Sequence, residues 1–174
     1  MLEELDASIR RGHTNKVKKI LQALVAQGDA QHAAHLRPLL TSEVPDGIML
    51  RNLTRAFFRL NRTSLSDCST LFLLQDIANI NVQDALLEVV GYDRMVPPVE
   101  VQKQIILQFF YFGDFLDHRD STDPRYGLAA ACAQWEESIV HRFLLHCLRV
   151  DDAGLRYVAE NSLKRKYVKL RSHC

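Results

Sequence analysis

The sequence lacks the motifs of most enzymes and of secreted proteins. It has only seven glycines, and no phosphate loop, dinucleotide fingerprint, Gly-x-Ser-x-Gly or His-Glu-x-x-His motif occurs. Its four cysteines form no Cys-x-x-Cys pair, which is typical of free thiols in a reducing compartment rather than of a disulfide framework. No apolar run approaches the roughly 18 residues of a membrane span. We therefore expect an intracellular protein, cytoplasmic or nuclear, with no membrane association, no cofactor and no enzymatic activity.

The balance of charges is close to even. With 22 basic and 21 acidic side chains the formal net charge is +1, so no strong field draws the whole molecule to nucleic acid or membrane. An apolar fraction of 47% with 25% charged residues is ordinary for a folded protein, and 174 residues fit one domain. We expect a single domain over residues 1–174, with a fragment of a longer helical array as the alternative.

Apolar residues recur at steps of three and four over most of the chain, which predicts amphipathic helices. Gly28 and Gly91 are expected to end helices, and Asp29 to cap one. Residues 99–116 are apolar nearly all round, which predicts a buried helix. The predicted helices cover residues 2–10, 14–27, 29–37, 46–62, 66–79, 81–91, 99–116, 125–149, in one piece or two, and 152–171. No segment alternates apolar and polar residues as a strand does, so the predicted fold class is all-α.

One stretch in the middle of the chain resembles a known family. Residues 73–96 read Leu-Leu-Gln-Asp-Ile-Ala-Asn-Ile-Asn-Val-Gln-Asp-Ala-Leu-Leu-Glu-Val-Val-Gly-Tyr-Asp-Arg-Met-Val. They resemble the junction between two armadillo repeats, and residues 99–107 resemble the start of the long helix that follows. The resemblance implies antiparallel helices stacked as a short armadillo- or HEAT-like solenoid, with a compact helical bundle as the alternative. It also implies a partner-binding role for Asp76, at the place of the asparagine that holds an extended peptide in that family.

A row of arginines lies along the predicted helix 46–62, on the side opposite Ile48, Leu53 and Phe57. Its members are Arg51, Arg55, Arg59 and Arg62. Such a row repels itself unless acidic neighbours or an acidic ligand compensate it. We predict that it binds an acidic segment of a partner protein, with guanidinium groups contacting carboxylates through two bonds each. Pairing within the chain, with Glu43, Asp67 or a neighbouring helix, is the alternative that the sequence leaves open.

Aromatic side chains are the other candidate anchors, because aromatic residues dominate the energetics of many protein interfaces. Tyr111 and Trp135 are the two that we assign to partner binding. Together these features favour a protein-interaction module, an adaptor or scaffold that binds an acidic or amphipathic segment. The alternative is a nucleic-acid-binding domain, which requires the basic groups at 16–19, 51–62 and 164–171 to converge on one surface.

Two groups of residues have the spacing of metal ligands. His32 and His35 stand at i and i+3, and Glu137 and His141 at i and i+4. The first pair lacks a complete ligand set, and the second lacks a Glu-x-x-His partner helix and lies among apolar residues. Residues 118–120 read His-Arg-Asp, but the rest of the kinase signature is absent. We therefore predict no metal site and no catalytic residue.

Overall fold

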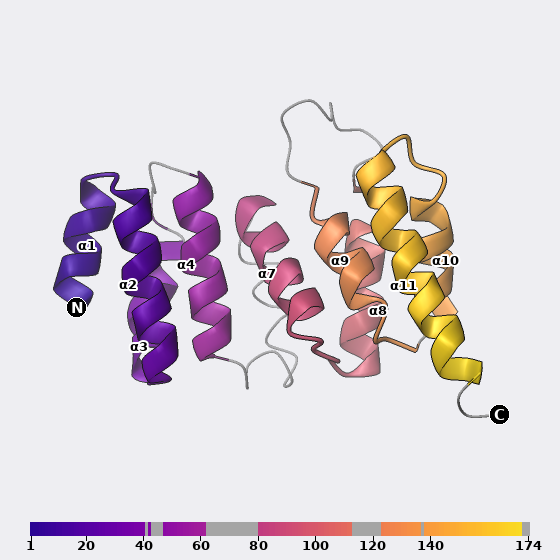
Figure 1. Cartoon of the computed structure of the whole chain (residues 1–174), viewed down its shortest axis with the longest axis horizontal. Coiled ribbons are helices and arrows are strands. Elements are labelled where there is room, and N and C mark those ends of the chain that lie inside the picture. Colours follow the sequence, from indigo (N-terminus) through magenta and orange to yellow (C-terminus); the bar gives the residue numbers. More distant parts are fainter. Residues whose placement is uncertain (41, 43–46, 62–79, 113–122, 137, 172–174) are drawn as a thin grey trace.

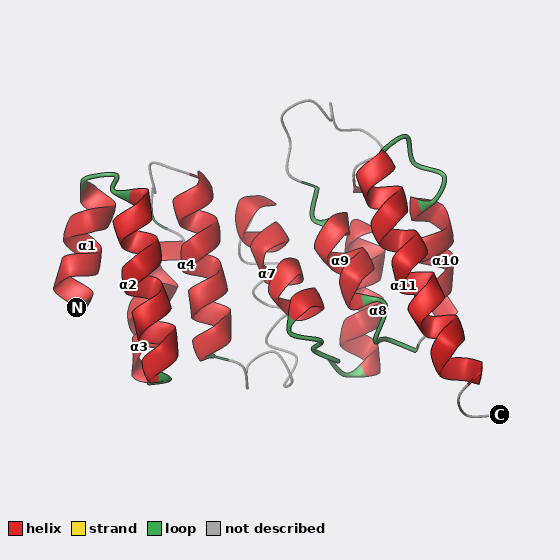
Figure 2. Cartoon of the chain, viewed as in Figure 1, coloured by secondary structure: helices red, strands yellow, loops and turns green. Residues whose placement is uncertain are grey.

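The computed structural model describes all residues except 41, 43–46, 62–79, 113–122, 137 and 172–174, and over this part it contains helices and no strand (Figure 2). The α-helices are α1 (Leu2–Arg10), α2 (Thr14–Gln27), α3 (Gln31–Leu36), α4 (Gly47–Leu60), α7 (Ile80–Tyr92), α8 (Val99–Phe109), α9 (Arg125–Ala131), α10 (Ser138–Cys147) and α11 (Ala153–Arg171). A 3-10 helix, η1 (Arg37–Leu40), follows α3. The all-α prediction is confirmed for the described residues, whereas predicted helix 66–79 lies outside them.

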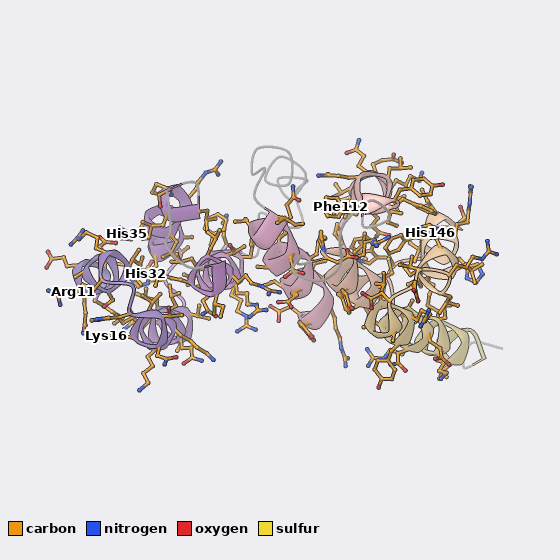
Figure 3. The ribbon with its side chains drawn as sticks, turned by 90° about the horizontal axis from the view of Figure 1, so that it is seen from above. Arg11, Lys16, His32, His35, Phe112 and His146 are labelled. Atoms are coloured by element: carbon orange, nitrogen blue, oxygen red, sulfur yellow. The ribbon has the colours of Figure 1, made fainter. Side chains whose placement is uncertain are left out.

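The helices form an elongated row with α1 at one end and α10 and α11 at the other (Figure 1). Contacts pass along the row from α1 to α2, α4, α7, α9 and α11. Seen from above, α3 and α8 lie to one side of this row (Figure 3). The buried apolar side chains form one cluster that extends from Leu5 in α1 to Leu163 in α11. Among the described helices, none is long and apolar enough to cross a membrane.

Two local predictions at the N-terminal end are confirmed. Gly28 ends α2 with φ 70°, a left-handed conformation that costs glycine little, and its N–H donates to the carbonyl oxygen of Leu24 at 3.3 Å. Asp29 then accepts a hydrogen bond from the backbone N–H of Gln31 at 2.8 Å through its Oδ1. These bonds satisfy backbone groups that a helix end leaves without an intrahelical partner.

The prediction that Gly91 ends its helix is wrong. Helix α7 runs through Gly91 to Tyr92, and Arg94 in the following turn adopts a positive φ of 54°. A Cβ atom on Gly91 would lie 2.9 Å from the carbonyl oxygen of Gly127 in α9. Gly91 is therefore the residue that lets two helices approach closely, and not a helix terminator.

The helix predicted at 99–116 is also not buried all round. Helix α8 ends at Phe109, and its Val101, Ile105 and Phe109 side chains are buried. Leu107 is 65% exposed, because it lies on the opposite side of the helix. In α4, Ile48 is likewise 64% exposed, although the sequence grouped it with Leu53 and Phe57, which are buried; the first buried residue of this helix is Met49.

Trp135 belongs to the core, so its assignment to partner binding is wrong. It lies between α9 and α10, the two pieces into which the predicted helix 125–149 divides. Its side chain is 0% exposed, and its indole Nε1 donates to the carbonyl oxygen of Met95 at 3.0 Å. A buried indole N–H needs such a partner, and this bond ties the loop after α7 to the loop after α9.

Candidate functional site

The arginine row on α4 faces two carboxylates of α7. Arg51 pairs with Asp84, and Arg55 pairs with Glu88. A longer contact of 3.6 Å joins Nη2 of Arg51 to Oε1 of Glu88. We call these four residues the ion-pair ladder. It is the pairing with a neighbouring helix that the sequence left open as an alternative.

Burial sets the electrostatics of the ladder. The side chain of Asp84 is 3% exposed, and this burial raises its pKa above the ordinary value, although the charge of Arg51 opposes the rise. Burial and the like charge of Arg51 lower the pKa of Arg55. Each charge of the ladder thus needs its partner on the other helix, because an unpaired charge in such a place is costly.

Two clefts adjoin the ladder and share Glu88 and Tyr92 as lining residues. The first has a volume of about 400 Å³ and lies between α2, α4 and α7; its charged lining residues are Lys18, Arg55, Arg59 and Glu88. The second has a volume of about 410 Å³ and lies between α4, α7, α9 and α11; its charged lining residues are Arg51, Asp84, Glu88 and Asp123. We call them the basic cleft and the acidic cleft.

The basic cleft combines exposed cations with an apolar lining. Lys18 on α2 and Arg59 on α4 are exposed, whereas Arg55 is held by Glu88. Buried Leu21 and Ala56 are apolar lining residues, and Gln22 and Asn52, whose side chains are amides, line the same cleft. Amide groups both donate and accept hydrogen bonds, so the cleft offers contacts for charge, backbone and apolar groups together.

Tyr92 marks the boundary between the clefts. It is the last residue of α7 and is 75% exposed, although it is a large aromatic side chain. Together with Glu88 it lines both clefts, so the two clefts adjoin at these residues. Tyrosine combines an apolar ring with a polar hydroxyl, a combination that is enriched where proteins bind each other.

Near α9 the acidic cleft is lined by Asp123 and Tyr126, and both side chains are held by ion pairs or hydrogen bonds. Arg125 is fully buried, and its Nε lies 3.0 Å from Oδ2 of Asp123, whose Oδ1 also accepts the backbone N–H of Arg125 at 2.9 Å. The hydroxyl of Tyr126 donates to Oδ1 of Asp152 at 2.6 Å. Burial, followed by this hydrogen bond, raises the pKa of Tyr126 to about 12. These lining residues are thus positioned by charges and hydrogen bonds.

The structure brings together only some of the residues that the sequence assigned to partner binding. Arg51, Arg55 and Arg59 lie at the two clefts, whereas Arg62 and Asp76 lie outside the described residues. Tyr111 is 62% exposed, but it follows α8 and packs edge-on against the ring of His146, which lies toward the other end of the molecule from His32 (Figure 3).

Several residues of the site were missed from the sequence. Asp84 and Glu88 could have been found, because they stand four residues apart in the same way as Arg51 and Arg55, which is the spacing that lets two helices pair charges face to face. Gln22 and Tyr92 gave no comparable signal, and Lys18 was considered only within the basic group 16–19 of the nucleic-acid alternative. They reach the site only because α2 and α7 pack on either side of α4.

The three basic groups do not all meet. Lys18 and Arg59, from the first and second groups, share the basic cleft. Lys16 is instead paired with Glu4 at 2.9 Å, with its nitrogen directed to α1. The third group starts at Lys164, which pairs with Glu160 at 2.8 Å, and lies in the last part of α11 at the far end of the row (Figure 1). The convergence that the nucleic-acid alternative requires is therefore incomplete.

The pair His32 and His35 lies far from the histidines of α10. Figure 3 shows His32 and His35 near one end of the molecule and His146 of α10 near the other. Nε2 of His35 lies 3.0 Å from Oδ1 of Asp6 in α1. Within the described part of the chain, no three His, Cys, Asp or Glu side chains are grouped as metal ligands. Glu137 is not among the described residues.

Comparison with known proteins gives no relative. The chain matches no protein family, no curated protein and no solved structure. The armadillo resemblance of residues 73–107 therefore stays a prediction from the sequence. What can be inferred about function comes from the two clefts and the ladder between them.

Proposed function

We propose that the chain is a non-catalytic protein-interaction module, an adaptor or scaffold that binds a segment of a partner protein along the basic and acidic clefts. The observation that carries this proposal is the shared wall of the two clefts. Because Glu88 and Tyr92 line both, one extended segment that crosses Tyr92 contacts both clefts. The arrangement of α2, α4, α7 and α9 side by side supports a solenoid-like stacking, which characteristically presents such extended binding surfaces.

The charges of the site divide into internal and partner-facing ones. Arg51 and Arg55 are used within the molecule, where they hold α4 against α7. Lys18 and Arg59 are exposed in the basic cleft and carry the attraction for an acidic or amphipathic segment. Within the described part of the row, Arg59 is thus the arginine that we assign to partner binding, and Lys18 of α2 lines the same cleft.

The nucleic-acid alternative has less support from the same geometry. The acidic cleft directly adjoins the basic one, and its three carboxylates face only Arg51 among its charged lining residues. A polyanion that extended past Tyr92 would meet Arg51 and the buried Arg125 already paired with Asp84 and Asp123, so these two arginines would give its phosphates little attraction. A protein segment can match both clefts, because it can carry charges of both signs.

Selection from a displayed library of random linear 12-residue peptides tests the proposal. We expect the protein to select peptides that carry acidic residues and an apolar residue, and to bind them in a manner that weakens with salt. Arg59→Glu and Tyr92→Ala should each weaken binding of a selected peptide about 10-fold or more. Arg142→Glu, an exposed arginine on α10, is the matched control and should bind normally. Failure to select any peptide, or equal binding by all variants, would contradict the proposal.

A further inference from the structure

We propose that the basic cleft holds a phosphorylated side chain of the partner segment. This inference rests on the proposed function and adds the chemistry of the ligand. It starts from the charges that line the cleft. Lys18, Arg55 and Arg59 supply three positive charges, and Glu88 supplies one negative charge, so two positive charges remain in excess.

The excess of two positive charges matches a phosphate better than a carboxylate. A phosphomonoester carries about −1.5 to −2 charges at pH 7, whereas one glutamate or aspartate side chain carries a single charge. The neighbouring Arg51 and Asp84 pair with each other and leave the balance unchanged. A single carboxylate in the cleft would leave one positive charge without compensation.

The hydrogen-bonding groups of the cleft point to the same ligand. The guanidinium of Arg59 can donate two parallel bonds to phosphate oxygens, and the ammonium of Lys18 adds a compact positive charge. Gln22, Asn52 and Tyr92 also line the cleft, and their side chains carry amide and hydroxyl groups that can donate hydrogen bonds. Glu88 is the one carboxylate among the lining residues, and Arg55 binds it. A phosphate, with three acceptor oxygens, uses such a donor-rich lining more fully than a carboxylate with two.

The surroundings of the cleft select a protein segment as the carrier of the phosphate. Leu21, Val25 and Ala56 give the cleft apolar lining, which suits the side chains that flank a modified residue in a peptide. On the other side of Tyr92, Asp84 and Asp123 are already paired with Arg51 and Arg125, so these two arginines give a second phosphate little attraction. One phosphate followed by a neutral or basic residue fits this sequence of charges, whereas the regular phosphates of a nucleic acid do not.

The first test compares peptide pools that differ at one position. Fluorescein-labelled 11-residue pools of random sequence carry phosphoserine, phosphotyrosine, serine, tyrosine or glutamate at the fixed centre, and binding is followed by fluorescence anisotropy. We expect one phosphorylated pool to bind at least about 10-fold more tightly than the glutamate pool and its own unphosphorylated pool. Equal binding of the phosphorylated and glutamate pools would overturn the inference and leave the proposed function intact. Binding of no pool would contradict both.

The second test locates the phosphate. Lys18→Ala with Arg59→Ala should weaken the phosphorylated pool about 100-fold, because two charge-assisted contacts are lost. The matched control is Lys19→Ala with Arg142→Ala, which removes the same charges from α2 and α10 at exposed positions outside the cleft. We expect the control to bind like the unaltered protein. Equal weakening in both double variants would show general attraction and overturn the inference.

Two further probes separate a phosphorylated segment from other phosphate carriers. A 20-nucleotide single-stranded RNA and vesicles that contain phosphatidylinositol phosphates are titrated against the same variants. We expect either probe to bind more weakly than the phosphorylated peptide pool at physiological salt. If RNA or vesicles bind more tightly and depend on Lys18 and Arg59, a phosphorylated protein segment is not the ligand and the inference fails.

Discussion

A Cβ atom on Gly127 would lie 2.5 Å from the backbone nitrogen of Glu88, a distance that real Cβ atoms do not reach. Helices α7 and α9 therefore contact each other through their backbones at this point. Gly91 contributes from the other side, since its Cβ would lie 2.9 Å from the carbonyl oxygen of Gly127. The helix that carries Asp84 and Glu88 is thus fixed to α9 by two glycines, which also fixes the wall between the clefts.

Gly127→Ala should destabilise the protein. Alanine favours a helix over glycine by about 1 kcal/mol, but its methyl group would force backbone atoms of α7 to move. We expect a net loss of about 1–3 kcal/mol in the free energy of unfolding, measured with urea. Gln104→Ala at an exposed position of α8 is the control and should change it by less than about 0.5 kcal/mol. A stabilised Gly127→Ala protein would show that α7 and α9 are not in close contact.

Phe109→Ala tests the core side of α8. Phe109 is 1% exposed, so removing its ring should cost about 3–5 kcal/mol in unfolding free energy. Leu107→Ala is the matched control on the same helix, because Leu107 is largely exposed, and it should cost less than about 1 kcal/mol. Thermal unfolding of both variants measures the difference. A larger loss of stability in Leu107→Ala than in Phe109→Ala would contradict the assignment of Phe109 to the buried side.

The sequence predicted most described helices because their apolar periodicity is a local property. Gly28 and Asp29 were also assigned correctly, since the caps they form depend on residues nearby in the chain. Gly91 was assigned wrongly because its use depends on Gly127, 36 positions later. Trp135 was wrong for the same reason, since the group that satisfies its indole is the carbonyl oxygen of distant Met95.

Reversing the charge of Arg55 and of Arg59 should have different effects on stability. Because Arg55 is paired with partly buried Glu88, Arg55→Glu should cost about 1–3 kcal/mol in unfolding free energy. Arg59→Glu should cost less than about 0.5 kcal/mol. Urea unfolding of the two single variants measures this difference. Equal stability of the two variants would contradict the pairing of Arg55 with Glu88.

Asp84 gives stability a defined pH dependence. Burial raises its folded pKa above the ordinary value of 3.8, so the folded protein binds this proton more tightly than the unfolded chain does. Its stabilising contribution is therefore fully present below pH 3.8 and is lost as the pH rises through the folded pKa. We expect the unfolding free energy of the unaltered protein to fall relative to Asp84→Asn over this window. A relative rise would show that the attraction of Arg51 outweighs burial.

Only part of the candidate site could be predicted from the sequence. The spacing of Arg51, Arg55 and Arg59 identified α4 as a charged helix, but the sequence could not decide between an internal and an external partner. That choice depends on which side of α7 faces α4. The basic cleft depends in addition on α2, which supplies Lys18 from 41 positions before Arg59. Such long-range pairings are set by helix packing, for which periodicity gives no register.

The buried position of Trp135 provides an intrinsic fluorescence signal that tests whether the protein unfolds cooperatively. It is the single tryptophan, and its indole joins the loops after α7 and α9, so intrinsic fluorescence follows the C-terminal helices alone. Far-UV circular dichroism follows every helix, including α1 to α4. We expect the two signals to change at the same urea concentration in the unaltered protein, because the ladder couples α4 to α7. In Arg55→Glu the dichroism should change before the fluorescence, as the N-terminal helices unfold independently.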